Sequence, residues 1–305
     1  MTFDSRFGVF GSPDQELAGV PHDAVQVSPH VPGALAIEDM ESASLSKMVI
    51  AAPPGTVERR YALALSLRAL KPGASLTVMA PKEKGGGRIA KELEALGCDV
   101  EASSRRHQRI CKTTCPPAFN EAVEACIADG APRFLDDLNF WSQPGIFSWD
   151  RIDSGTTLLL SALPSLAGRG ADFGCGIGVL ARAILANASV THMDLVDIDR
   201  RAIAAARRNI VDPRAAFHWA DIRVFTGLQN LDFVVMNPPF HDGGREDKAL
   251  GQAFIRQCHR ALRDGGKAWL VANRHLPYES VLAAAFSDVA LRTEENGFKV
   301  YEATK

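Results

Sequence analysis

The stretch GADFGCGIGVLARAILA, residues 170–186, decides the fold of this chain. It begins with a short stretch over 170–173 that predicts a β-strand, and from Val179 its apolar residues recur at helical spacing. Glycines at 174, 176 and 178 lie between the two elements and allow a tight turn that approaches a ligand with no Cβ in the way. A strand, a glycine turn and a helix in this order predict one step of a parallel α/β sheet.

The same alternation continues on both sides of this stretch. Helices are predicted over 156–163, 200–209, 247–262 and 277–286, and strands over 191–196, 215–219, 231–236 and 268–272. Two further strand-like runs, 289–295 and 298–304, flank Asn296-Gly297, a pair typical of a type I′ hairpin turn. We therefore predict an α/β fold whose C-terminal part is a doubly wound parallel sheet that ends in an antiparallel hairpin.

A weaker alternation precedes it. Strands over 48–52 and 75–80 with helices over 56–70 and 88–96 predict half of a second Rossmann-like sheet, whose first turn, Ala-Pro-Pro-Gly-Thr, lacks the spaced glycines. Residues 1–45 are rich in Pro, Gly, Asp and Glu, which favours irregular structure. From these patterns alone we expect an irregular acidic segment over 1–45, half of an α/β sheet over 47–110, a connector over 112–146 and the glycine-turn domain after it.

Composition excludes several classes of protein. The 305 residues carry 34 basic and 36 acidic side chains, so the chain lacks the positive field of a strong, sequence-independent nucleic-acid binder. The six cysteines show neither a C-x-x-C pair nor zinc-finger spacing, so we expect free thiols and no metal. No apolar run reaches the roughly 18 residues that a membrane span needs. We expect a protein of the reducing cytoplasm.

Acidic residues lie beside the glycine turn and at the ends of the next strands. Asp172 leads the turn, and Asp197 ends the next strand, where a carboxylate can accept hydrogen bonds from both hydroxyls of a ribose. The glycine spacing departs from the G-x-G-x-x-G of dinucleotide sites, which favours a ligand without a pyrophosphate. Asp199 competes for the ribose and otherwise caps the following helix. Asp221 follows the third strand and can accept from an adenine amino group or cap a turn.

The strand over 231–236 runs directly into Asn237-Pro238-Pro239-Phe240. Ligands of open α/β sheets bind at the carboxyl ends of strands, where this tetrad lies. The Asn237 side-chain oxygen and the Pro238 carbonyl can each accept one N–H of an exocyclic amine and turn its lone pair towards an incoming methyl group. The prolines stiffen the loop, and Phe240 can stack on a flat ring. In the alternative interpretation, the prolines only end the strand and the phenylalanine only covers the sheet edge.

Together, the glycine turn, Asp197 and the Asn237 tetrad resemble the class I S-adenosylmethionine-dependent methyltransferases of amino groups. The stretches 144–155, 237–243, 271–278 and 298–301 are similar to the bacterial ribosomal RNA guanine-N2 methyltransferases, especially the 16S small-subunit type. The resemblance implies two tandem Rossmann-like methyltransferase domains, a degenerate one over 46–135 and a catalytic one over 136–305. It also implies S-adenosylmethionine as the cofactor, and the N2 amine of a guanine in ribosomal RNA as the methyl acceptor. It implies catalytic roles for Asn237, Pro238 and Phe240, and cofactor contacts from Asp172, Gly174, Cys175, Gly176, Gly178, Asp197, Ile198, Asp221 and Asn237.

Other functions remain open from the sequence. Methyltransferases of protein glutamine amides and of adenine N6 use the same style of tetrad, although they usually end it in Tyr. A catalytically silent RNA-binding or assembly module would keep the fold, but the intact Asp197 and Asn237 argue against it. The expected partner is ribosomal RNA or the small ribosomal subunit. Two groups of cations are candidates for RNA contact, and each can equally be a solvated face: Arg105, Arg106, His107, Arg109 and Lys112; and Arg200, Arg201, Arg207 and Arg208.

Overall fold

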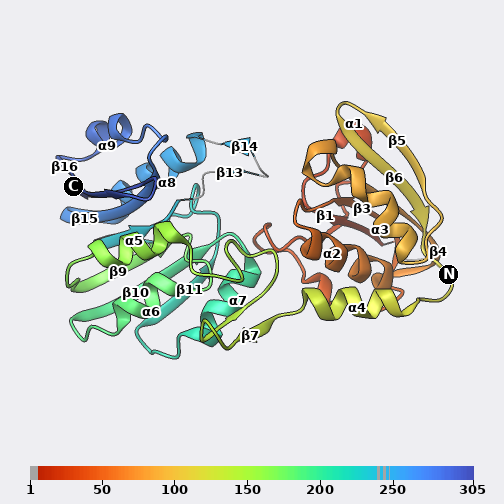
Figure 1. The fold of residues 1–305 in the computed structure, drawn as a ribbon, viewed down its shortest axis with the longest axis horizontal. Helices are drawn as coiled ribbons and strands as arrows, with labels where there is room; N and C mark the ends of the chain where they lie inside the picture. The colour runs from red at the N-terminus through yellow and green to blue at the C-terminus, as the bar shows by residue number, and fades with distance from the viewer. Residues whose placement is uncertain (1–5, 239–240, 243–244, 247) are drawn as a thin grey trace. The chain divides into compact units, whose positions relative to one another are not determined.

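The structure, a computed structural model, describes residues 6–238, 241–242, 245–246 and 248–305 (Figure 1). Its contacts divide the chain into two compact units, Met1–Ala131 and Pro132–Lys305. Each unit is built around one large sheet.

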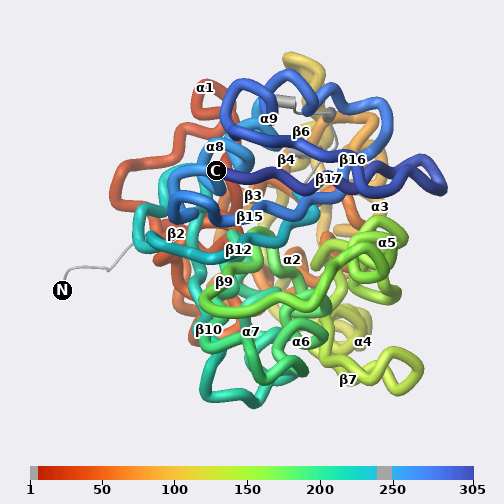
Figure 2. Tube along the Cα trace, turned by 90° about the vertical axis from the view of Figure 1, so that its left-hand side faces the viewer, coloured from red at the N-terminus to blue at the C-terminus, as the bar shows by residue number. Residues whose placement is uncertain are grey.

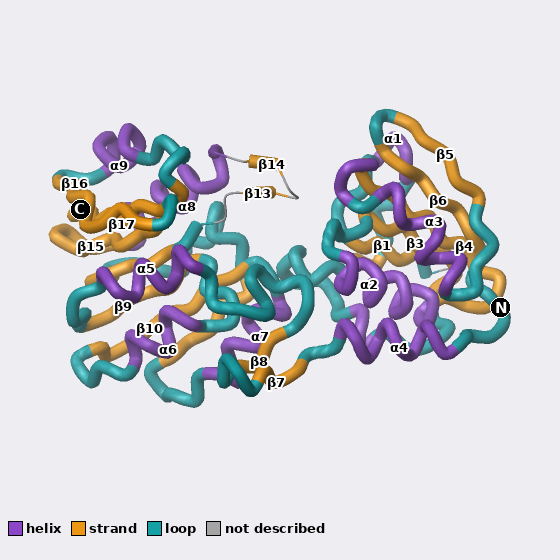
Figure 3. The backbone as a smooth tube through the Cα atoms, in the orientation of Figure 1, coloured by secondary structure: helices purple, strands orange, loops and turns teal. Residues whose placement is uncertain are grey.

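The second unit contains a seven-stranded sheet in the order β11-β10-β9-β12-β15-β17-β16. Figure 3 shows strands in orange and helices in purple. The strands from β11 to β15 are parallel, and β17 is antiparallel to both of its neighbours. This confirms the predicted doubly wound sheet with an antiparallel end. The strands are β9 (Gly168–Phe173), β10 (Val190–Asp197), β11 (Ala215–Trp219), β12 (Leu231–Met236), β15 (Leu262–Asn273), β16 (Asp288–Glu295) and β17 (Phe298–Thr304).

The hairpin that ends this sheet is also confirmed. Asn296 and Gly297 both have positive φ, at 52° and 83°, and they connect β16 to β17. Type I′ turns require this backbone at both central residues, which is why asparagine and glycine are favoured there. Because β17 pairs with β15 on its other side, the last strand of the chain lies inside the sheet and β16 forms the edge.

Helices pack on both faces of the sheet (Figures 1 and 2). Successive side chains of β12 show the division, because Phe233 and Val235 enter one hydrophobic core while Val234 and Met236 enter the other. A strand buried on both faces has consecutive apolar residues, as β12 does over 233–236. The first core is covered by α5 (Ser154–Ala162), α6 (Val179–Leu185) and α7 (Arg200–Asn209), and the second by α8 (Lys248–Ala261) and α9 (Glu279–Ala285). The remaining strands of this unit form two short antiparallel pairs, β7 (Arg133–Leu135) with β8 (Phe140–Ser142) and β13 (His241–Asp242) with β14 (Arg245–Glu246).

The strand order reverses at β9, which has β10 on one side and β12 on the other. The crevice at such a reversal, outside the carboxyl ends of the strands, is where open α/β sheets bind ligands. The glycine turn follows β9, Asp197 ends β10 and Asn237 follows β12. The topology therefore brings three segments that the sequence singled out to one edge of one sheet.

The first unit contains a six-stranded sheet in the order β2-β1-β3-β4-β6-β5. Its strands from β2 to β4 are parallel, and β6 is antiparallel to β4 and β5. The elements are β1 (Phe7–Phe10), α1 (Gln15–Ala18), β2 (Val25–Gln26), the 3-10 turn η1 (Ile37–Asp39), β3 (Leu45–Ala51), α2 (Thr56–Ala69), β4 (Leu70–Pro81), the 3-10 turns η2 (Lys82–Lys84) and η3 (Gly86–Arg88), α3 (Ile89–Ala95), β5 (Glu101–Arg105), β6 (Gln108–Thr114) and α4 (Glu121–Gly130).

Two expected boundaries in this half differ from the structure. The segment over 1–45 is not a separate irregular piece, because β1 pairs with β3 through residues 7–10 and buries Val9 and Phe10 in this unit. Residues 121–130 belong to this unit and not to a connector between the two halves, because α4 packs on α2 and Gly130 lies directly against the Tyr61 ring. The division between the units falls after Ala131, four residues before the expected one.

The turn between β3 and α2 holds a buried ion pair. Arg59 on α2 is 1% exposed, and its guanidinium donates to both carboxylate oxygens of Glu92 at 2.6 and 2.8 Å. It also donates to the carbonyls of Pro53 and Pro54, the residues that replace the spaced glycines. The polar groups of this turn are thus directed at a protein side chain, in keeping with the expectation that the first domain is degenerate.

The cysteines are all free, as expected, and five of the six are buried. Among the described residues, no helix is both long and apolar enough to cross a membrane.

Replacing Arg59 with Met should lower the free energy of unfolding by about 3–5 kcal/mol, because it leaves the Glu92 carboxylate buried without its main partner. Urea denaturation followed by far-ultraviolet circular dichroism measures this change. The matched control is Arg60→Met, since Arg60 lies 3.5 Å from the same carboxylate but is 53% exposed and should contribute about 0.5 kcal/mol or less. Equal effects of the two variants would show that the pair does not stabilise the turn.

Candidate active site

The glycine turn after β9 is held by the neighbouring strand β10. The N–H groups of Gly174 and Cys175 donate to the carbonyl of Val196 at 2.9 and 3.1 Å, and the N–H of Gly178 donates back to Cys175 at 2.9 Å. The N–H of Gly176 donates to the Asp197 carboxylate at 2.8 Å. The turn is therefore positioned before any ligand binds.

The three glycines of the turn have different surroundings. All have positive φ, at 76°, 52° and 90°, which side chains other than glycine rarely adopt. A Cβ on Gly176 would meet nothing within 4 Å, so the backbone there borders open space that a ligand can approach closely. A Cβ on Gly178 would lie 2.9 Å from Ile210, at the end of α7. Gly178 therefore permits close packing of α6 on α7. The sequence had predicted only a cofactor contact for this residue, and that contact stays a prediction.

The two acids at the end of β10 have separate roles. Asp197 accepts from the N–H of Gly176 through Oδ2 and from the N–H of Asp199 through Oδ1, each at 2.8 Å. Asp199 caps α7 by accepting from the N–H of Arg201 at 2.9 Å, and its carboxylate pairs with the Arg201 guanidinium. Asp199 thus has the helix-cap role weighed from the sequence, although it is buried and not solvated. A contact between Asp197 and a ribose stays a prediction, since a carboxylate oxygen can accept more than one hydrogen bond.

The other two residues expected near the nucleoside lie further along the same edge. The carbonyl of Ile198 accepts from the Trp219 indole at 2.8 Å. Asp221 accepts from the backbone and the guanidinium of Arg223 at 2.6–2.9 Å, and this partner holds the pKa of Asp221 below its usual value. Asp221 has the local turn contact weighed as the alternative, and its contact with adenine stays a prediction.

Asp172, which leads the turn, is fully buried. Burial, with the charge of Asp197 as a second cause, raises the pKa of Asp172 to about 8. The same two causes raise the pKa of the adjacent Cys175 thiol. Both groups are therefore mainly uncharged near neutral pH, and the predicted cofactor contact of Asp172 stays a prediction.

Asn237 leaves β12 with its side chain in a defined orientation. Its Nδ2 donates to Asp153 Oδ2 at 2.9 Å and to Thr156 Oγ1 at 3.0 Å, while Oδ1 is buried with no donor in reach among the described residues. Pro238 is buried. Phe240 lies outside the described residues, so its predicted stacking on a base stays a prediction.

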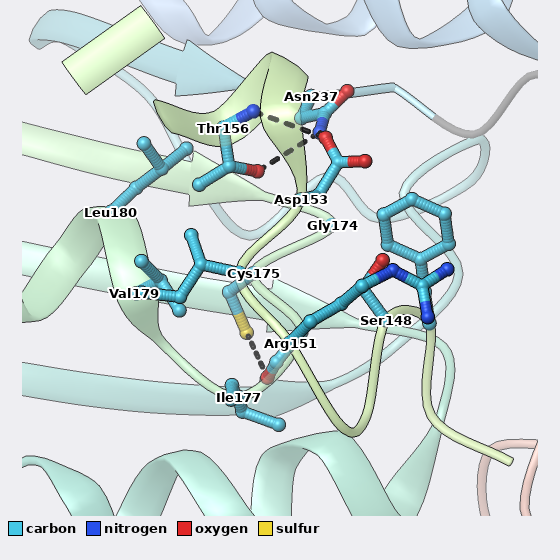
Figure 4. A pocket seen from close by; sticks show the side chains of 13 residues that line it. Ser148, Arg151, Asp153, Thr156, Gly174, Cys175, Ile177, Val179, Leu180 and Asn237 are labelled. Atoms are coloured by element: carbon cyan, nitrogen blue, oxygen red, sulfur yellow. Dashed lines mark hydrogen bonds between the residues drawn. The ribbon is translucent and has the colours of Figure 1, made fainter. Parts of the chain in front are cut away.

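One pocket brings part of the predicted site together (Figure 4). It is lined by residues from 147–156, by residues from 174–180 and by Asn237. Of the residues predicted to bind the cofactor, Gly174, Cys175, Gly176 and Asn237 line it, and the described Asp172, Gly178, Asp197, Ile198 and Asp221 do not.

The lining includes residues to which sequence reasoning gave no role. Asp153 and Thr156 come from the start of α5, and Phe147 is a 67% exposed aromatic ring at the pocket. The segment 144–155 carried part of the family resemblance, and Asp153-Ser-Gly before an apolar helix is a typical helix start. These signals pointed to the segment, but not to a contact with Asn237.

Comparison with known proteins gives concordant matches. The family described as Methyltransferase small domain matches residues 137–302. A protein of Shewanella loihica named ribosomal RNA small subunit methyltransferase C is 32% identical over 251 residues, 79% of this chain and 72% of that protein. One of Hahella chejuensis with the same name is 34% identical over 249 residues, 78% and 71% of the two chains. A solved T. thermophilus 16S rRNA N2 methyltransferase in complex with AdoMet and guanosine shares the fold, with a TM-score of 0.79 at 24% identity over 99% of this chain and 88% of that one.

Replacing Asp172 with Asn should make the protein relatively more stable as the pH rises. The folded state holds the Asp172 proton up to a pKa of about 8, whereas the unfolded chain releases it near its ordinary value of 3.8. The wild type therefore loses stability between these two pH values, and the variant lacks this loss. Urea denaturation at about pH 5 and about pH 8 measures the difference. Tryptophan fluorescence suits it, because all four tryptophans lie in the second unit. A stability difference that is the same at both pH values would contradict the burial of an ionisable acid.

Proposed function

This chain belongs to the ribosomal RNA small subunit methyltransferase C family, and we propose that it transfers a methyl group from S-adenosylmethionine to the N2 amine of a guanine in 16S ribosomal RNA. The observation that carries the proposal is the meeting of Asn237 with the glycine turn in one pocket. The turn suits a nucleoside-type cofactor, and the amide suits an exocyclic amine.

The residues present fit this cofactor. The open space beside Gly176 would take its methionine end, and Asp197, at the end of β10, would accept from its ribose hydroxyls. When bound, S-adenosylmethionine supplies a methyl group on a positively charged sulfur.

Asn237 and Pro238 would orient the amine. The nitrogen of guanine N2 is a poor nucleophile because its lone pair is delocalised into the ring. If the Asn237 Oδ1 and the Pro238 carbonyl each accept one N–H, the lone pair turns out of the ring plane towards the methyl carbon. A nitrogen–carbon bond then forms as the carbon–sulfur bond breaks, the sulfur keeps the electron pair, and the amine loses one proton to solvent. Phe240 would stack on the base, and the exposed Phe147 offers a second ring at the same pocket.

The exposed arginines of α7 support a role in RNA contact. Arg207 and Arg208 are exposed and lie over the rings of Phe217 and Trp141, at 4.8 and 4.6 Å from the ring centres. Arg201, from the same predicted cluster, is buried against Asp199 and therefore does not belong to such a surface. The partner would be ribosomal RNA or the small subunit, and the site of action the cytoplasm.

The hairpin of β5 and β6 holds the other cationic cluster, residues 105–112. Arg106 pairs with the carboxylates of Asp14 and Glu16, which leaves the remaining cations of the cluster as the candidates for phosphate contact.

Incubation with labelled S-adenosylmethionine tests the proposed reaction. Both naked 16S RNA and small subunits from a strain that lacks this modification should be offered. We expect label in N2-methylguanosine when the RNA is digested and analysed by mass spectrometry. Label in N6-methyladenosine or only in protein would overturn the proposed substrate.

Asn237→Ala should leave cofactor affinity within a few-fold and lower turnover by about 10²-fold or more, because the amine is no longer oriented. Calorimetric titration with the cofactor and single-turnover kinetics separate the two quantities. Loss of cofactor binding would show instead that Asn237 mainly serves the cofactor.

A further inference from the structure

The amide of Asn237 can perform its proposed role in only one of its two orientations. Its oxygen can accept an N–H of the substrate amine. Its NH₂ group cannot, because both the NH₂ group and the amine are hydrogen-bond donors. The two ends of an amide have nearly the same shape, so their hydrogen-bond partners decide which end points where. Catalysis therefore depends on what holds the NH₂ end.

Two acceptors from the start of α5 hold that end (Figure 4). Asp153 Oδ2 and Thr156 Oγ1 accept from Nδ2 at 2.9 and 3.0 Å, across 84 and 81 residues of sequence. A carboxylate has no hydrogen to donate and so can pair only with the NH₂ end of the amide. The opposite end, Oδ1, is the acceptor that this arrangement reserves for another donor.

Asp153 is itself fixed by the helix that it begins. It is the N-cap of α5, and the same Oδ2 accepts from the N–H of Thr156 at 3.1 Å. A Cβ on the buried Gly155 would lie 3.0 Å from this oxygen and 3.0 Å from the Phe298 ring, so the position has no room for a larger residue. The carboxylate is thus held by a helix start packed against β17.

We propose that Asp153 is a positioning residue which, with Thr156, fixes the Asn237 amide so that its oxygen faces the amine of the target base. The inference rests on the proposed function. It predicts that the hydrogen bond from Asn237 Nδ2 to Asp153 Oδ2 affects the chemical step and not the binding of RNA or of the cofactor.

Asp153→Ser separates this role from helix capping. Serine is as good an N-cap as aspartate, so α5 should remain formed. Its shorter side chain cannot accept from both Thr156 and Asn237, so kcat should fall by about 10²-fold while the KM for RNA and the affinity for the cofactor stay within a few-fold. Asp153→Asn places a carbonyl oxygen where Oδ2 lies, accepts from both groups and should retain most of the activity.

Thr156→Val and Thr157→Val form a matched pair on one helix. Thr156→Val removes one of the two acceptors of the Asn237 NH₂ group. Its kcat should lie between the kcat of the wild type and that of Asp153→Ser. Thr157 is exposed, and its hydroxyl donates to the backbone carbonyl of Asp153 at 3.2 Å and not to the Asp153 carboxylate or to Asn237. Thr157→Val should therefore leave kcat near the wild-type value. Thermal melts of all variants show that they fold.

Nuclear magnetic resonance supplies a readout that does not depend on activity. The side-chain NH₂ signals of Asn237, identified by their loss in Asn237→Ala, should shift in Asp153→Ser and stay near their wild-type position in Asp153→Asn. Wild-type kcat with unshifted signals in folded Asp153→Ser would overturn the inference. A tenfold or greater loss of cofactor affinity would also overturn it, because Asp153 would then contact the cofactor directly. If the wild type methylates no guanine, the proposed function fails, and the resonance positions alone decide the orientation of the amide.

Discussion

The end of β10 holds the turn on which the rest of the site depends. The carbonyl of Val196 receives two N–H groups of the glycine turn, and the Asp197 carboxylate receives a third. These contacts join the turn to the neighbouring strand, so its shape depends on the register between β9 and β10. The pKa of Asp172 is raised mainly by its own burial and secondly by the charge of the Asp197 carboxylate. One residue therefore links the geometry of the turn to the charge of the acid that leads it.

The two units differ in the turn that joins a strand of the sheet to the following helix. In the second, the turn between strand and helix leaves open space beside Gly176. In the first, the corresponding turn directs the carbonyls of Pro53 and Pro54 at Arg59, whose charge Glu92 balances. Burying two charges is costly unless geometry and further hydrogen bonds compensate, and here they do. The carbonyls of Pro53 and Pro54 therefore have their hydrogen-bond partner within the protein, in a turn that holds a buried ion pair.

Much of the second unit follows from its sequence because its signals are local. The apolar run of β12, the spaced glycines and Asn296-Gly297 each specify an element within a few residues. The errors arise where a short pattern has a distant partner. The strand at 7–10 is flanked by turn-forming residues and becomes recognisable only through its pairing with β3. Residues 101–114 carry many polar side chains and form a hairpin because β6 completes the sheet beside β4.

In the second unit, the sequence by itself determined the order of the helices and of the strands in the large sheet, the glycine turn, the hairpin and the strand end that carries Asn237, because periodicity and turn chemistry act between near neighbours. Only the tertiary structure decided that Gly178 serves the packing of α6 on α7 and that Asp153 holds an amide 84 residues away. A hydrogen bond is defined by distance and direction in space, and a linear pattern specifies neither for residues on different elements.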